Sequence, residues 1–234
     1  MEIKLGKMEI QERLLELLKT DEAKALANVG IAGISVKYPI AAVFLTAAHE
    51  IAGLADKMRF IAVAKGLSTE LNQEEQINIL YNYVDKSEEN AFYVANTLRK
   101  ALLADSQVAC TIMGKMLACH AKQGNAYDQD DNIIFHALET ATDEDIRLFT
   151  KAMQEYKTPK GTFRIPLDEL DSHLFATMGW GEFNRLFYGP SGGITWTDAD
   201  DAGFDTSHSP TAAAERLFEY ISSMKQILEY GKDA

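Results

Sequence analysis

The chain has 234 residues, of which 47% are hydrophobic and 25% charged, a composition typical of a folded globular protein rather than a disordered one. Its formal net charge of -12 and its pI near 4.9 mean that nucleic-acid phosphates and anionic membrane surfaces are repelled on average. The densest basic cluster, Lys57, Arg59 and Lys65, is diluted by Asp56, so no nucleic-acid partner is expected.

The first predicted elements are short. Apolar residues recur at helical spacing over residues 8–19, and Thr20 is expected to cap a second, shorter helix. Glycines and a following proline then interrupt helix formation, so residues 28–38 are predicted to be an irregular loop. The opening residues lack the charged-then-apolar order of a signal peptide. A cytoplasmic protein is therefore expected.

A longer helix is predicted from Pro39 to about Lys65. Its first ten residues are apolar on nearly every side, which indicates a central helix enclosed by others. The apolar region as a whole, residues 25–55, has charge-free stretches of about a dozen residues, short of the ~20 that span a bilayer. The apolar stripe expected along this helix is Ile40, Phe44, Ala47, Ile51, Leu54, Met58 and Ile61.

Five further helices are predicted up to residue 156, each from a capping residue followed by apolar residues at helical spacing. Their short connections favour antiparallel neighbours, so residues 1–156 are expected to form a multi-helix bundle. The expected N-caps are Asn72, Ser87, Asp105, Asp128 and Thr142, with Gly124 ending one helix in a left-handed turn. The expected apolar faces are Ile77, Leu80, Tyr81 and Val84; Phe92, Ala95, Leu98 and Leu102; Val108, Ile112, Met116 and His120; Ile134, Ala137 and Leu138; and Ile146, Phe149, Met153 and Tyr156.

The two cysteines fall within one of these predicted helices. Cys110 and Cys119 lie nine residues apart, which separates their Cα atoms by roughly 13 Å, too far for a disulfide. Reduced thiols packed in a core are expected instead, as is usual in the cytoplasm.

The amino-acid composition changes at Lys157, after which glycine and proline become frequent. Short strands are expected over residues 162–165, 194–197 and 204–206. A closing helix from Pro210 to about Tyr230 is expected to have Ser209 as its cap. The predicted fold class is thus mainly α, with a second domain over residues 157–234 that forms a small α+β module of winged-helix-like layout.

The charge of this C-terminal module opposes DNA binding. Between Pro166 and Ser209 the sequence has Arg185 as its single Lys or Arg, against eight acidic residues. A wing that reads DNA requires the opposite sign, so protein contacts or dimerisation are favoured.

Two acidic runs are candidates for a divalent cation, and no other cofactor is expected. The better candidate of the two lies around Gly203 and supplies oxygen ligands, but it lacks a bidentate Glu at the right distance, and a solvated turn is the favoured interpretation. Its residues are Asp198, Asp200, Asp201 and Asp205. The second run, Asp128, Asp130 and Asp131, resembles a calcium loop, with Glu139 at its twelfth position. Ile133 stands where the turn needs glycine, and helix N-terminal charges are favoured there.

No catalytic constellation is evident, which favours a non-enzymatic protein and leaves the question of an enzyme open. The five histidines match no zinc-binding spacing, and no serine nucleophile motif is present. The turn at residues 189–193 is rich in glycine but lacks the lysine and the strand-to-helix context of a phosphate-binding loop.

Five residues mark a helix that ends in a glycine turn and is followed by an acidic helix cap: Lys115, Ala118, Gly124, Tyr127 and Asp131. This arrangement resembles the TerB-like (tellurite-resistance-associated) helical domains, over about residues 72–155. The resemblance implies a compact helical bundle with an accessory or sensing role in bacterial stress response or antiviral (phage) defence. In that family an acidic residue commonly precedes the turn glycine and joins a metal-associated cluster; Gln123 stands there in this chain, which argues against metal binding by analogy.

Three functions follow from these patterns. The first is a non-enzymatic helical interaction or regulatory protein that binds a protein partner or forms a homo-oligomer. The second is a membrane-perturbing effector that releases residues 25–55, although their near-uniform apolarity favours burial in a core over insertion at a membrane surface. The third is a metal-binding protein that uses the acidic loops.

Overall fold

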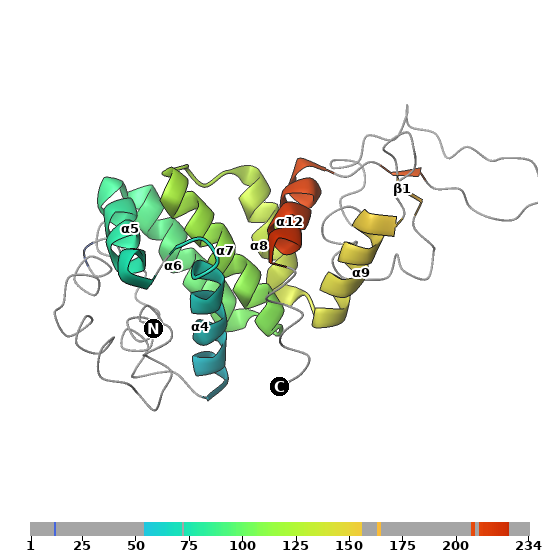
Figure 1. Ribbon diagram of the computed structural model, residues 1–234, viewed down its shortest axis with the longest axis horizontal. Coiled ribbons are helices and arrows are strands. Elements are labelled where there is room, and N and C mark those ends of the chain that lie inside the picture. Colours follow the sequence, from blue (N-terminus) through green and yellow to red (C-terminus); the bar gives the residue numbers. More distant parts are fainter. Residues whose placement is uncertain are drawn as a thin grey trace, which may run out of the picture. The chain divides into compact units, whose positions relative to one another are not determined.

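The protein is mostly helical in a computed structural model, which confirms the mainly α fold class (Figure 1). The described part contains seven α-helices and one pair of two-residue strands. None of the helices in that part is long and apolar enough to cross a membrane. The residues that the structure describes are Glu12 and residues 54–71, 73–155, 163–164, 207–208 and 211–224.

The chain divides into two compact units, Met1–Asp128 and Gln129–Ala234. The sequence predicts its division later, after residue 156; residues 156–162 lie outside the described part, and that boundary stays a prediction. The described helices of the first unit are α4 (Leu54–Leu67), α5 (Gln73–Lys86), α6 (Glu88–Leu103) and α7 (Gln107–Gln123). The described elements of the second unit are α8 (Gln129–Thr140), α9 (Asp143–Glu155), β1 (Phe163–Arg164), β2 (Ser207–His208) and α12 (Ala212–Ser223).

The first unit is built around α7, which contacts α4, α5 and α6. Every residue of α7 from Ala109 to Ala118 is buried, as are His120 and Ala121. Figure 1 shows α4 lying alongside α7. The helix with the most complete burial in the described part is therefore α7. The helix predicted from Pro39 is confirmed over α4, and its earlier residues lie outside the described part.

Two glycines bring the backbones of α4 and α7 into direct contact. A Cβ added at Gly66 would overlap the carbonyl oxygen of Thr111 and lie 2.8 Å from the amide nitrogen of Lys115. A Cβ added at Gly114 would overlap the carbonyl oxygen of Val63 and lie 2.8 Å from its carbonyl carbon. Real Cβ atoms essentially never approach other heavy atoms this closely. No residue larger than glycine fits at either position unless the helices separate.

The predicted apolar faces of four helices are confirmed at their central positions. Leu80 and Val84 of α5 are buried, as are Ile112 and Met116 of α7. In the second unit the buried positions of the predicted faces are Ile134, Ala137 and Leu138 of α8 and Ile146 and Phe149 of α9. Helical periodicity alone was sufficient for these helices, because their largest apolar residues are the buried ones.

The predicted faces of α4 and α6 are wrong. Met58 and Phe92 are 41% and 42% exposed, whereas the sequence places both on apolar faces. The buried side of α6 instead includes two polar residues, each of which has a backbone acceptor. Asn90 Nδ2 donates to the carbonyl of Tyr83 at 2.9 Å, and Thr97 Oγ1 donates to the carbonyl of Tyr93 at 2.8 Å. The side of α6 that faces the core therefore includes polar residues whose hydrogen bonds are satisfied. A pattern of apolar residues alone gives the wrong orientation for this helix.

Three of the predicted helix ends are confirmed. Ser87 caps α6, and its hydroxyl accepts a hydrogen bond from the amide of Asn90. Gly124 ends α7 with a φ of 68°, in the left-handed region that favours glycine. Thr142 caps α9 reciprocally: its hydroxyl accepts from the amide of Asp145, and the Asp145 carboxylate accepts from the amide of Thr142. This is a capping box with aspartate in place of glutamate.

Two predicted caps are wrong by one or two residues. Ser106, not Asp105, caps α7, and its Oγ lies 2.9 Å from the amide nitrogen of Ala109. Thr211, not Ser209, caps α12, and its Oγ1 accepts from the amide of Ala214 at 3.0 Å. Neighbouring residues with equal capping ability cannot be distinguished by type, because the choice depends on where the helix begins to pack.

In the second unit α12 packs on α8 and α9. Strands β1 and β2 pair in antiparallel register, with Phe163 opposite His208. The strand predicted over residues 162–165 is confirmed at β1, whereas the strand predicted over residues 204–206 is found at Ser207–His208. The strand predicted at residues 194–197 and the helices and loop predicted before Pro39 lie outside the described part.

The contact at Gly114 predicts that replacing this glycine by alanine lowers the stability of the protein, although alanine is the better helix former. Helix propensity alone favours alanine over glycine by about 1 kcal/mol in the middle of a helix. Because a Cβ at Gly114 meets the Val63 backbone, we expect Gly114→Ala to lower the free energy of unfolding by about 3 kcal/mol. Chemical denaturation of the full chain measures it, with Gln107→Ala, a change at an exposed position of the same helix, as the control. A Gly114→Ala variant more stable than the parent would contradict the contact.

Candidate functional site

The predicted metal loop lies outside the described residues. Asp198, Asp200, Asp201 and Asp205 belong to that part of the chain, so the cation site that they predict stays a prediction. Within the described part, no group of three or more His, Cys, Asp and Glu side chains could hold a metal ion.

The acidic run at the start of α8 is held by an arginine rather than arranged around a cation site. Asp130 and Asp131 stand in the first turn of α8, where carboxylates complement the helix dipole. Arg216 of α12 lies 3.3 Å from a carboxylate oxygen of each. Asp131 is fully buried, whereas Asp130 and Arg216 are about one-third exposed. The ion pairs therefore fasten α12 to α8, and the sequence interpretation of helix N-terminal charges agrees with this geometry.

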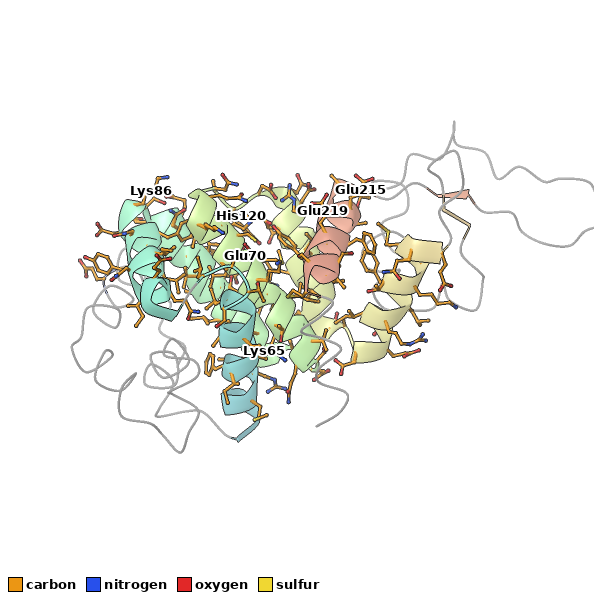
Figure 2. The ribbon with its side chains drawn as sticks, viewed as in Figure 1. Lys65, Glu70, Lys86, His120, Glu215 and Glu219 are labelled. Carbon is orange, nitrogen blue, oxygen red and sulfur yellow. The ribbon has the colours of Figure 1, made fainter. Side chains whose placement is uncertain are left out.

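A buried lysine in the first unit forms an ion pair with a partly exposed glutamate. Lys115 of α7 is 4% exposed, and its Nζ lies 2.7 Å from Oε1 of Glu70, in the turn after α4. Lys122 approaches the other oxygen, Oε2, at 3.5 Å. Figure 2 shows Glu70 at this turn, beside α7. The hydrogen bond from Lys115 holds the pKa of Glu70 below its ordinary value of 4.5.

Both cysteines are free thiols, as predicted. Cys110 is buried and donates to the carbonyl of Ala101 at 3.4 Å. Cys119 is half-buried, and burial, with a smaller effect of the Glu70 charge, raises its pKa above the ordinary 9.0. The Cys119 side chain is therefore a protonated thiol at neutral pH, which does not favour nucleophilic chemistry.

An aromatic cluster packs beneath the turn that follows α7. The ring of Tyr93 lies 5.0 Å from the imidazole of His120 and 4.9 Å from the ring of Tyr127, measured between centroids. Tyr83 meets Tyr93 edge-on at 6.4 Å and donates its hydroxyl to the carbonyl of Asn125 at 2.9 Å. The sequence interpretation of His120 as a packing histidine agrees with this position. The cluster fixes the turn in place.

The residues of the TerB-like resemblance take different places in these clusters. Lys115 belongs to the ion pair with Glu70, Tyr127 to the aromatic cluster, and Gly124 to the left-handed turn. Gln123, at the position that is acidic in that family, is exposed and accepts a hydrogen bond from Asn125 Nδ2 at 2.6 Å.

The feature best suited to binding another molecule is the solvent side of α6, which we call the outer face. Phe92 and Leu103 are 42% and 58% exposed and lie eleven residues apart, about three helical turns, so they share this face. Asn96 and Arg99 stand between them, joined by a hydrogen bond of 3.2 Å from Arg99 Nη2 to Asn96 Oδ1. The outer face thus carries two apolar groups with a polar centre.

A third exposed apolar residue lies on α4. Met58, Phe92 and Leu103 are the exposed large hydrophobic residues of the described part. Arg59 Nε donates to the carbonyl of Ala104 at 2.7 Å, which joins α4 to the residue that follows α6. The outer face itself is defined by Phe92 and Leu103, which share one side of α6.

Sequence reasoning missed this surface because it assigned Met58 and Phe92 to buried faces. A signal was present in the charged residues that surround Phe92 on a helical projection. Glu88, Glu89 and Arg99 all fall on the same half of the helix as Phe92. A face bordered by so many charges is more often exposed than buried.

Comparisons with protein-family models, with curated proteins and with solved structures return no match for this chain.

The ion pair of Glu70 predicts a specific pH dependence. We expect Glu70→Gln to lower the free energy of unfolding by about 1.5–3 kcal/mol at neutral pH, because the buried Lys115 loses its carboxylate partner. Since the pKa of Glu70 is lowered in the folded state, this contribution is present above pH 4.5 and is lost as the pH falls through the folded pKa. Denaturation of both proteins across a pH series measures the difference.

The matched control is Glu144→Gln, which removes a carboxylate paired with Arg147 on the exposed surface of α9. We expect little change in stability from it at any pH, because solvent screens exposed pairs. A difference between parent and Glu70→Gln that persists undiminished in acid would show that the carboxylate charge is not its cause.

The ion pairs of Arg216 predict that this side chain stabilises the packing of α12 on α8. We expect Arg216→Leu to lower the free energy of unfolding by about 1.5–3 kcal/mol, because the buried Asp131 loses a charged partner. Hydrogen exchange should show faster opening of α12. Arg216→Lys should have a smaller effect, since it keeps the charge but lacks the planar fork that spans two carboxylates. Unchanged exchange in α12 after Arg216→Leu would contradict this role.

Proposed function

We propose that this protein is a helical interaction module that binds another protein chain through the outer face of α6. The observation that carries the proposal is the exposure of Phe92 and Leu103 on one face of one helix. Protein contact surfaces typically combine a few large apolar anchors with a polar surround.

Two features make the outer face a stable platform. The opposite side of α6 is buried and carries satisfied hydrogen bonds at Asn90 and Thr97. The helix also begins at a firm cap, Ser87, one residue after α5 ends. Anchors on a rigid helix lose less conformational freedom on binding than anchors on a loop, which favours recognition.

The setting that we propose follows from the sequence resemblance. A TerB-like bundle implies an accessory or sensing protein of bacterial stress response or antiviral defence, in the cytoplasm. We further propose that residues 157–234 form the small winged-helix-like module, whose acidic character suits a protein partner rather than DNA.

Site-specific photocrosslinking in the native cell tests the interaction. Phe92, Leu103 and, as a control, the exposed His136 of α8 are replaced one at a time by p-benzoylphenylalanine in the full chain. We expect discrete crosslinked species from positions 92 and 103 and none from position 136, whatever the identity of the partner. Equal and diffuse crosslinking from all three positions would overturn the proposed function.

A further inference from the structure

The charges of α6 follow a regular arrangement along and around the helix. The helix is acidic at its first turn, with Glu88 and Glu89, and basic near its end, with Arg99 and Lys100. These signs complement the dipole of the helix itself. Their position around the helix adds a second property, because each acidic residue has a basic residue eleven positions later on the same side.

The pairs flank Phe92 on opposite sides. Eleven residues are about three turns, so Glu88 and Arg99 stand on one flank of Phe92, and Glu89 and Lys100 on the other. Glu88, Glu89 and Arg99 are exposed, and Lys100 is half-buried. The outer face therefore carries Phe92 and Leu103 with polar residues between them, and the charges on either side of Phe92 are acidic at one end of the helix and basic at the other.

The charge pattern of α6 is complementary to that of a second copy of the same helix in the antiparallel orientation. In a two-fold symmetric pair of antiparallel helices, each flank meets the same flank of the other helix, running the opposite way. When the two helices cross near residue 94 of each, Glu88 of one copy lies opposite Arg99 of the other, and Glu89 lies opposite Lys100. Symmetry repeats both pairs, so the contact has four of them. The two Phe92 side chains then meet near the symmetry axis. Antiparallel helix dipoles favour the same arrangement.

We propose, resting on the proposed function, that the partner of the outer face is a second copy of this chain, bound through antiparallel α6 helices. The formal charge of -12 on each chain opposes association at long range. At physiological ionic strength, however, exposed charges separated by more than about 8 Å are largely screened. The overall repulsion is therefore weakened, and the flank charges act at the short distances of the contact.

The hydrogen bond between Arg99 and Asn96 is compatible with this contact. It uses one of the two terminal nitrogens of the guanidinium, Nη2. An arginine side chain has five N–H donors, so others remain to meet Glu88 of the second copy. Asn96 also holds the guanidinium on the outer face, which lowers the entropy lost when the ion pair forms.

Charge reversal with complementation tests the inference on the full chain. Two double variants are made, Glu88→Lys with Glu89→Lys and Arg99→Glu with Lys100→Glu. We expect sedimentation velocity to show a reversible dimer of the parent that weakens with added salt. Each double variant alone should have a dissociation constant raised by at least about tenfold, because all flank pairs become repulsive. An equimolar mixture of the two should dimerise again, since every flank pair is then attractive.

Circular dichroism establishes that both double variants keep their helical content, so a loss of association is not a loss of folding. Failure of the folded variants to associate when mixed would overturn the inference, and so would variants that each dimerise like the parent. A parent chain that is monomeric at every concentration would also overturn it. In that case, photocrosslinks from position 103 to a different protein would leave the proposed function intact, whereas the absence of any crosslink would overturn both.

Discussion

The contact between the backbones of α4 and α7 is the constraint on which the rest of the first unit depends. Gly66 and Gly114 allow the two helices to approach until each glycine meets the main chain of the other helix. This approach brings the turn after α4 to the middle of α7, where Glu70 reaches Lys115 at 2.7 Å. The buried lysine is tolerated because the approach of the helices supplies its carboxylate partner.

Much of the helical architecture could be predicted from the sequence, because caps and helical periodicity are local signals. Ser87, Gly124 and Thr142 all end or begin a helix as their residue types indicate. The orientation of α6 could not be predicted, because Asn90 on its buried side has an acceptor only after the chain has folded. Gly66 and Gly114 indicated the close approach of α4 and α7 less clearly than the caps indicated the helix ends. A glycine inside a helix costs about 1 kcal/mol relative to alanine, so its presence there suggests a packing reason.

The candidate site was less predictable than the fold. Phe92 has the residue type of a core position, and its exposure follows from the tertiary orientation of α6 rather than from its neighbours in sequence. The ion pairs joining Lys115 to Glu70 and Arg216 to Asp131 link residues 45 and 85 positions apart. No local pattern relates such residues, because the contacts exist only when separate helices have packed. The acidic loop predicted as a metal site remains a sequence prediction.

The link between α5 and α6 consists of Ser87 alone. Its backbone is extended, with a φ of −162° and a ψ of 156°, so the chain leaves one helix and enters the next within a single residue. The hydroxyl of Ser87 accepts a hydrogen bond from the amide of Asn90, whose side chain donates back to the carbonyl of Tyr83 in α5. A change in the length of this link would alter the spacing between Tyr83 and Asn90, and with it the orientation of α6 that leaves Phe92 exposed.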